Sequence, residues 1–275
     1  MTAQTRSLER QRHPDRRGIS LKLPSGRVWY GMLGFLIVLP LWELVVQLGL
    51  VRRVTLSSPS AILVTAFNDL FVNRMLWGHL WISGQEYVLG FGLALITGIP
   101  LGLALGLNRR LNYLFDPWLS AIYATPTIAL TPLIIIVFGI GLQSKVVVIW
   151  LEAIFVIVVS TMAGVHAADK RYLDIAHSFK ASKLLRFRSV VVPASVPFIL
   201  TGIRLGSTRA LVGVVVAEFL ASNAGIGFYI NFAGTSFRTD RVMLGVLILG
   251  LLGVTLGEGL RRVERRFEKW RPAVN

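Results

Sequence analysis

Apolar residues gather in six stretches of about 20 residues, the length of helix that crosses the hydrocarbon core of a bilayer. The stretches are residues 28–50, 84–107, 117–139, 145–165, 195–218 and 242–260. Polar and charged residues collect in the segments between them. The pattern therefore predicts an all-α, polytopic membrane protein with six transmembrane helices.

The basic residues are divided unevenly between the two sides of these predicted spans. The chain of 275 residues has 29 Lys and Arg against 14 Asp and Glu, a formal net charge of +15. With the amino terminus inside, the inner segments hold 21 of the basic residues and the outer segments hold 6. Lys and Arg collect on the cytoplasmic side of membrane proteins, so both termini are predicted to be cytoplasmic. The same division argues against a soluble nucleic-acid-binding protein, because such a protein places its basic residues on one folded face.

The polar segments divide the chain into four parts. Residues 1–27 are basic and lack apolar periodicity, which predicts a cytoplasmic tail. Residues 28–83 contain the first span and then the turn sequence Leu56-Ser-Ser-Pro-Ser60, which predicts a short helix on the outer membrane surface. Residues 84–265 form the main transmembrane domain, and residues 266–275 form a second cytoplasmic tail.

The predicted third span contains residues that interrupt a helix. Thr125-Pro126, Thr127 and Thr131-Pro132 follow one another within it. Proline removes a backbone donor, and threonine hydroxyls can satisfy the carbonyls that are freed, so the span is predicted to be broken or kinked. A broken helix suits the lining of a transport pathway, and an ordinary packing kink explains the sequence equally well.

Charged residues inside membrane spans are costly and often mark function. Glu86 and Glu218 fall near predicted span ends, where snorkelling to the interface accounts for them. Glu152 and Arg209 lie deeper. They form either a structural ion pair or part of a polar conduit in which Arg209 favours an anion. The residues assigned to a candidate substrate pathway are Thr125, Thr127, Thr131, Glu152 and Arg209.

Small residues form a stripe in the second span. Gly90, Ala94, Gly98, Gly102 and Gly106 recur every fourth position, on one face of a helix. A face without bulk lets another helix backbone approach closely, so tight helix packing is predicted there.

The motifs of common catalytic sites do not occur in the sequence. There is no Gly-x-x-x-x-Gly-Lys-Ser/Thr phosphate loop, no His-Glu-x-x-His zinc pair and no Gly-x-Ser-x-Gly elbow. The chain has no cysteine, and its four histidines fall in four separate segments. We therefore predict no catalytic residues, no metal site and no cofactor held by this chain.

Residues 169–193, called here the 169–193 loop, form a basic and partly amphipathic island between two apolar stretches. Tyr172, Ile175, Ala176 and Phe179 share one face of a predicted helix that Asp169 can cap. Ser182 can cap a second short helix running to about Val190, and Pro193 ends that helix and opens the fifth span. An island of this kind is a surface that a second protein can bind from the cytoplasm.

The spacing in the 169–193 loop resembles the signature of binding-protein-dependent ABC importer permeases. In that signature Glu-Ala-Ala is followed by three residues, a glycine, nine residues and Ile-x-Leu-Pro. Asp174-Ile175-Ala176 stand at the first element, Lys180 at the glycine, and Val190-Val191-Val192-Pro193 at the last. Further short motifs, among them Leu41-Trp42-Glu43-Leu44, Phe138-Gly139-Ile140-Gly141 and Pro197-x-Ile199-x-x-Gly202-x-Arg204, resemble the nitrate, sulfonate and taurine branch. The resemblance covers roughly residues 35–265.

This resemblance implies the fold of a type I ABC importer permease in a bacterial cytoplasmic membrane. It implies a second permease copy, identical or a sister chain, a cytoplasmic ATPase dimer that binds ATP and Mg, and an external solute-binding protein. The residues that would couple to the ATPase are Asp174, Ile175, Ala176, Phe179, Lys180, Val190, Val192 and Pro193.

The branch resembled and Arg209 together favour an anionic solute such as a sulfonate, taurine or nitrate. A vitamin or pyrimidine precursor, and an uncoupled channel, are the alternatives. Lys180 departs from the family glycine, which would adopt a left-handed conformation at the end of the first short helix. The turn must therefore either differ from the family turn or accept strain.

Overall fold

The computed structural model describes residues 26–52, 54–168 and 170–267, and all regular elements in these ranges are helical. The elements are α1 (Gly26–Gln47), α2 (Pro59–Phe67), η1 (Asn68–Val72), α3 (Met75–Leu107), α4 (Arg109–Ala124), α5 (Thr127–Phe138), α6 (Leu142–His166), α7 (Lys170–Ser178), α8 (Lys183–Arg186), η2 (Phe187–Val191), α9 (Val192–Ala221), α10 (Ile226–Thr235) and α11 (Thr239–Phe267). The prediction of an all-α fold is confirmed. Most of the predicted amino-terminal and carboxyl-terminal tails, and the Asp169 cap, lie outside the described residues.

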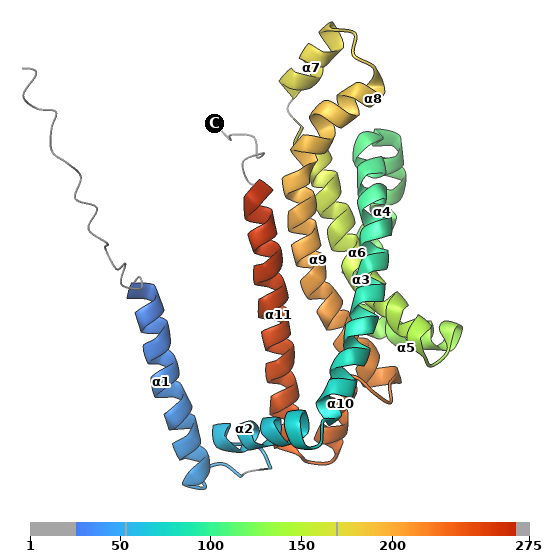
Figure 1. The fold of residues 1–275 in the computed structure, drawn as a ribbon. Coiled ribbons are helices and arrows are strands. Elements are labelled where there is room, and N and C mark those ends of the chain that lie inside the picture. The colour runs from blue at the N-terminus through green and yellow to red at the C-terminus, as the bar shows by residue number, and fades with distance from the viewer. Residues whose placement is uncertain (1–25, 53, 169, 268–275) are drawn as a thin grey trace, which may run out of the picture.

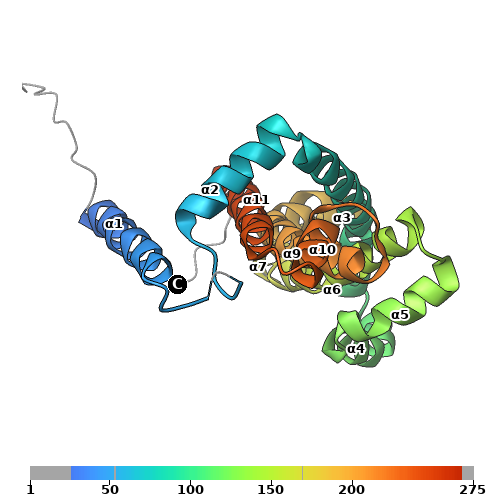
Figure 2. The same ribbon diagram turned by 90° about the horizontal axis from the view of Figure 1, so that it is seen from below.

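Four helices are packed side by side as a bundle: α3, α6, α9 and α11 (Figure 1). The short helices α2 and α10 lie together across one end of this bundle, which we call the α10 end (Figure 2). The helices α7 and α8 project from the opposite end, which we call the loop end. Helix α1 stands apart from the four-helix bundle and contacts α2.

The predicted spans agree with the structure in four cases out of six. Within the described residues, α3, α6, α9 with the segment before it, and α11 are each long and apolar enough to cross a bilayer. The first predicted span corresponds to α1, whose apolar part, Leu33–Gln47, is shorter than a usual span. The third corresponds to two helices.

The predicted break in the third span, residues 117–139, is confirmed. Helices α4 and α5 meet at an angle of 99°, and α4 begins at Arg109, where the Asn108 side chain accepts a hydrogen bond from the Arg110 amide at 3.0 Å. The break lies where it was predicted, at Thr125-Pro126. Thr125 is extended, with φ −80° and ψ 125°, because the proline that follows disfavours the helical conformation.

The stripe of small residues in α3 packs against α6, as predicted. A Cβ atom added to Gly90 would lie 2.5 Å from Ile149 Cβ, and one added to Gly102 would lie 2.6 Å from Thr161 Cβ. These separations are shorter than any van der Waals contact, so only glycine allows this approach. The close packing creates the main core, in which Ile149, Ile157 and neighbouring side chains are fully buried.

Helix α2 confirms the helix predicted after Ser58. The Ser58 hydroxyl accepts a hydrogen bond from the Ala61 amide, and Pro59 occupies the first position of the helix. Ile62 packs beneath it against Leu76 and Tyr229, in a second core at the α10 end. This packing holds α2 against α3, α10 and α11.

Candidate functional site

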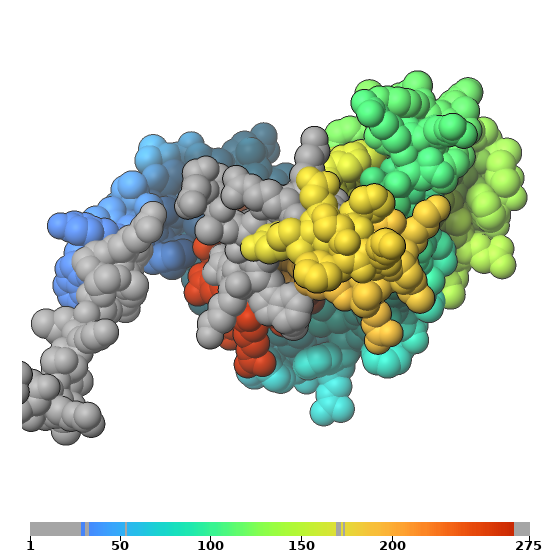
Figure 3. Space-filling model, turned by 90° about the horizontal axis from the view of Figure 1, so that it is seen from above, coloured from blue at the N-terminus to red at the C-terminus, as the bar shows by residue number. Residues whose placement is uncertain are grey.

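The helices of the 169–193 loop expose apolar side chains on the molecular surface. Phe179 is 82% exposed, and Tyr172, Ile175 and Leu184 are also exposed. In the space-filling view from the loop end, the yellow α7 and α8 stand at the front of the molecule (Figure 3). Large exposed apolar groups outside the bilayer mark a surface for binding another protein.

The end of α7 shows how Lys180 is accommodated. Its φ angle is +53°, in the left-handed region. The Ala181 amide donates to the Ala176 carbonyl at 2.9 Å, and the Lys180 amide donates to the His177 carbonyl at 2.9 Å. These two bonds are the pattern that usually ends a helix with glycine. The turn is therefore the one expected with glycine at this position, and lysine accepts the backbone strain.

The second half of the loop differs from its prediction. The Ser182 cap is confirmed, because its hydroxyl accepts a hydrogen bond from the Leu185 amide at 3.2 Å. However, α8 ends at Arg186, and the π-helical segment η2 continues directly into α9. Pro193 therefore lies in the first turn of α9 and does not end a helix. Val190, Val192 and Pro193 are half-buried, which places them at the base of the loop.

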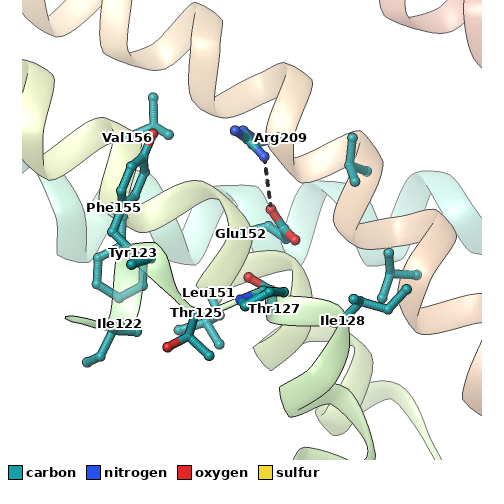
Figure 4. Close-up of a pocket in the computed structure, with 14 residues that line it drawn as sticks. Ile122, Tyr123, Thr125, Thr127, Ile128, Leu151, Glu152, Phe155, Val156 and Arg209 are labelled. Carbon is teal, nitrogen blue, oxygen red and sulfur yellow. Dashed lines mark ion pairs between the residues drawn. The ribbon is translucent and has the colours of Figure 1, made fainter. Parts of the chain in front are cut away.

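A cavity of about 420 Å³ lies where the α4–α5 break faces α6 and α9 (Figure 4). Thr125, Thr127, Glu152 and Arg209 line it, together with apolar and backbone groups from the same helices. The structure thus brings together four of the five residues assigned to a pathway. Thr131 does not line the cavity; it is fully buried and its hydroxyl donates to the Thr127 carbonyl at 3.1 Å.

Glu152 and Arg209 point toward each other across this cavity (Figure 4). Arg209 Nη1 and Glu152 Oε2 are 4.0 Å apart, at the outer limit of an ion pair. The Arg209 side chain is 54% exposed, whereas that of Glu152 is 11% exposed. Because guanidinium carries five N–H donors, Arg209 keeps donors free for an anion in the cavity while Glu152 partly balances its charge.

Three charged residues that sequence reasoning did not bring together meet inside the bundle near the α10 end. The Lys145 ammonium lies 2.6 Å from Glu86 Oε1 and donates to Ser222 Oγ at 2.7 Å. Glu218 accepts hydrogen bonds from the Ser83 hydroxyl at 2.6 Å and the Gly227 amide at 2.5 Å. Both glutamates are almost completely buried. Snorkelling is therefore the wrong interpretation of Glu86 and Glu218.

A second buried ion pair joins η1 to α11. Arg241 Nε lies 2.9 Å from Asp69 Oδ2, and the Tyr229 hydroxyl donates to the same carboxylate at 2.8 Å. Burial raises the pKa of Tyr229, so its hydroxyl remains a neutral donor. Asp69 is 1% exposed, and these contacts satisfy it. These contacts fix α10 and α11 against η1.

No group of three or more His, Cys, Asp or Glu side chains suited to a metal ion occurs in residues 26–52, 54–168 and 170–267.

Comparison with known proteins identifies the family. Residues 98–269 match the model of the binding-protein-dependent transport system inner membrane component. A Bacillus subtilis protein described as an aliphatic sulfonates transport permease is 33% identical over 256 residues, covering 92% of each chain. The taurine transport system permease of Escherichia coli is 32% identical over 242 residues, covering 86% of this chain and 88% of its own.

Solved structures show the same fold. The chain of an inward-facing methionine ABC transporter aligns with a TM-score of 0.64 at 15% identity, covering 70% of this chain and 96% of that one. An amino acid ABC transporter aligns with a TM-score of 0.62 at 15% identity, covering 73% and 97%. Membership of this family implies a separate ATPase and a binding protein as partners. The chain therefore belongs to the binding-protein-dependent inner-membrane components, as a non-enzymatic permease subunit of an ABC importer.

Proposed function

We propose that the solute carried by this permease is a small anion, such as a sulfonate, taurine or nitrate, and that Arg209 contacts it. The observation that carries the proposal is the exposed guanidinium in a cavity lined by broken backbone and threonines. A planar guanidinium binds sulfonate or carboxylate oxygens through paired hydrogen bonds, and it stays charged at all relevant pH values. The names of the sulfonate and taurine relatives support the same class of solute.

The threonines contribute differently to the proposed pathway. The Thr125 hydroxyl donates to the Ala121 carbonyl at 2.9 Å, so its lone pairs remain available to a polar solute or to water. Thr127 opens α5 on the other side of the break. The bend therefore places polar groups at a depth where a continuous helix would present only apolar side chains.

The 169–193 loop supports the proposal that a cytoplasmic ATPase dimer, which holds ATP and Mg, binds at the loop end. The exposed residues Asp174, Ile175, Phe179 and Lys180 would contact the ATPase, with Ala176 behind them. Val190, Val192 and Pro193 would anchor the loop to the bundle. We also infer that both termini are cytoplasmic and that the α10 end is outside; a cytoplasmic loop end and the division of basic residues support this inference.

A second permease copy and an external solute-binding protein complete the proposed importer. We infer that residues 84–265 form its transmembrane domain, with residues 28–83 added at one edge. Arg209 and the cavity beside it are exposed in the single chain, as expected of a pathway that a second permease copy helps to enclose.

The test is uptake by proteoliposomes that contain the permease, its ATPase and its binding protein. Arg209→Gln is expected to lower uptake of a labelled sulfonate, taurine or nitrate roughly tenfold or more, since hydrogen bonds to charged groups contribute about 1.5–3 kcal/mol. Arg262→Gln, at an exposed arginine of α11, is the matched control. Unchanged uptake by the Arg209 variant, with the complex intact, would refute the anion contact.

A second candidate solute is a neutral pyrimidine precursor. A formylaminopyrimidine transport permease of Halalkalibacterium halodurans is 29% identical over 239 residues, covering 87% of this chain. Such a solute does not need Arg209, so uptake of formylaminopyrimidine that is insensitive to Arg209→Gln would favour it. Deletion of residues 169–192 distinguishes an uncoupled channel, because downhill flux would survive the deletion only in a channel.

A further inference from the structure

Three buried charged residues from three helices meet near the α10 end. Glu86 comes from α3, Lys145 from α6 and Glu218 from α9, and their exposed fractions are 2%, 8% and 1%. Lys145 Nζ lies 2.6 Å from Glu86 Oε1. Ser83, which lies one helical turn before Glu86 on the same face of α3, donates to Glu218 Oε1 at 2.6 Å, so the two glutamates reach the same site. Glu86 and Lys145 are 59 residues apart in the sequence, so their ion pair joins helices that are distant along the chain.

The formal charges in this cluster do not balance. Two carboxyl groups share one ammonium, and no other cationic side chain in the described ranges forms an ion pair with either glutamate. His79 is nearby, but its Nδ1 accepts a hydrogen bond from the Gly225 amide at 3.0 Å, which an imidazolium could not do. Ser83, Ser222 and the first amides of α10 are neutral. With both glutamates ionised, one negative charge would be buried without a counter-charge, which is strongly unfavourable.

One oxygen of the cluster also lacks a partner. Glu86 Oε1 faces Lys145, whereas Glu86 Oε2 is buried without a hydrogen-bond donor. Two ionised carboxylates cannot donate to each other, because both offer only acceptor atoms. A buried acceptor without a donor is rare in folded proteins. The missing atom is a hydrogen.

We propose that Glu86 and Glu218 together bind one proton, which they share beside Lys145. The proton cancels the excess negative charge and supplies the missing donor between the two carboxyls. Paired carboxyls that share one site commonly hold a proton between them in this way, and the proton belongs to the pair rather than to one residue.

The proton has a mechanical consequence for the permease. The Glu218 carboxyl accepts a hydrogen bond from the Gly227 amide. The Ser83 hydroxyl, which donates to Glu218, also accepts a hydrogen bond from the Ile226 amide at 2.8 Å. The start of α10 is therefore bonded to the same group that joins α3, α6 and α9. With the proton bound, these elements are held together; without it, two like charges face each other inside the bundle. The α10 end is thus expected to loosen at alkaline pH.

Infrared spectroscopy of the permease–ATPase complex in lipid nanodiscs tests the proposal directly. A protonated carboxyl has a carbonyl stretch that is separate from the carboxylate bands and shifts in D2O. We expect such a band at neutral pH in the wild type, lost on alkaline titration. Glu86→Gln and Glu218→Gln should each abolish it, because either change leaves one carboxylate beside Lys145. Glu258→Gln, at an exposed glutamate of α11, should retain it.

The absence of the band from the wild-type complex at neutral pH would overturn the proposal, whatever the variants do. Persistence of the band in both glutamine variants would also overturn it. A second measurement is the thermal midpoint of the complex against pH. We expect the wild-type midpoint to fall from neutral to alkaline pH and the Glu218→Gln midpoint to change less. Equal slopes for the two proteins would contradict the proposed role of the proton.

Discussion

The backbone strain at Lys180 can be relieved by one substitution, Lys180→Gly. Lys180 has φ +53° and ends α7 with the two hydrogen bonds from Lys180 and Ala181 amides. A left-handed conformation brings a Cβ atom close to the carbonyl that follows it, and glycine has no Cβ. The Lys180 side chain is exposed, so its removal costs no buried contact.

The expected gain follows from these facts. A left-handed residue other than glycine costs on the order of 1 kcal/mol. Lys180→Gly removes this cost. Part of the gain is offset, because glycine increases the conformational entropy of the unfolded loop. Since 1.4 kcal/mol corresponds to a factor of ten, a local gain approaching 1 kcal/mol lowers the equilibrium constant for opening of the last turn of α7 by up to about fivefold.

Hydrogen exchange measured by mass spectrometry is the suitable assay, because it reports local opening rather than global unfolding. Peptides that cover α7 and its C-terminal turn should exchange up to about fivefold more slowly in Lys180→Gly than in the wild type. Lys180→Ala is the matched control, since it removes the charge and keeps the Cβ atom, and it should bring no protection. Equal protection by both variants, or faster exchange in Lys180→Gly, would refute the argument from backbone strain.

Three further substitutions test other parts of the structure. Gly90→Ala should lower stability by about 1–3 kcal/mol through overpacking, as measured by thermal unfolding, whereas Gly92→Ala, which meets open space, should not. Lys145→Met should lower the free energy of unfolding by about 3–5 kcal/mol, because it leaves Glu86 buried without its cation. The double variant Lys145→Met/Glu86→Gln should regain much of this stability, and no regain would contradict the ion pair. Phe179→Ala should weaken co-purification of the ATPase while thermal stability stays unchanged, and undiminished co-purification would remove Phe179 from the proposed interface.

Local sequence was sufficient to predict most of the helices. Long apolar runs give α6, α9 and α11, because the membrane core demands about 20 residues in helical form. The break at Thr125-Pro126 was predictable from proline chemistry, but its angle of 99° was not. The start of α3 was missed: the helix begins at Met75, but Gly78, His79 and Ser83 interrupt the apolar run before residue 84, where the predicted span begins.

The candidate site shows the same limit. The cap at Ser182 depends on neighbours within a few residues, so local sequence predicted it. At Lys180 the sequence left a different turn and a strained turn both open, and the structure has the strained turn. Glu86 and Lys145 pair across 59 residues, and Ser83 and Glu218 pair across 135. A glutamate near the end of a span looks the same in sequence whether it reaches the interface or pairs inside the bundle. Only the packing of α3 on α6 and α9, set by residues such as Gly90, decides between them.

Helix α9 connects the features discussed above. Residues Lys183–Ala221 form one continuous helical stretch of 39 residues, which begins in the 169–193 loop, carries Arg209 at the cavity and ends beside Glu218. A partner that displaces the loop therefore acts on a helix that also positions the cavity and the buried carboxyls. The proposed variants separate these roles: Phe179→Ala is expected to weaken ATPase association, whereas Arg209→Gln is expected to leave association intact and lower uptake. If both variants lost the ATPase, Arg209 would be supporting the structure of α9, and its assignment to the solute would fail.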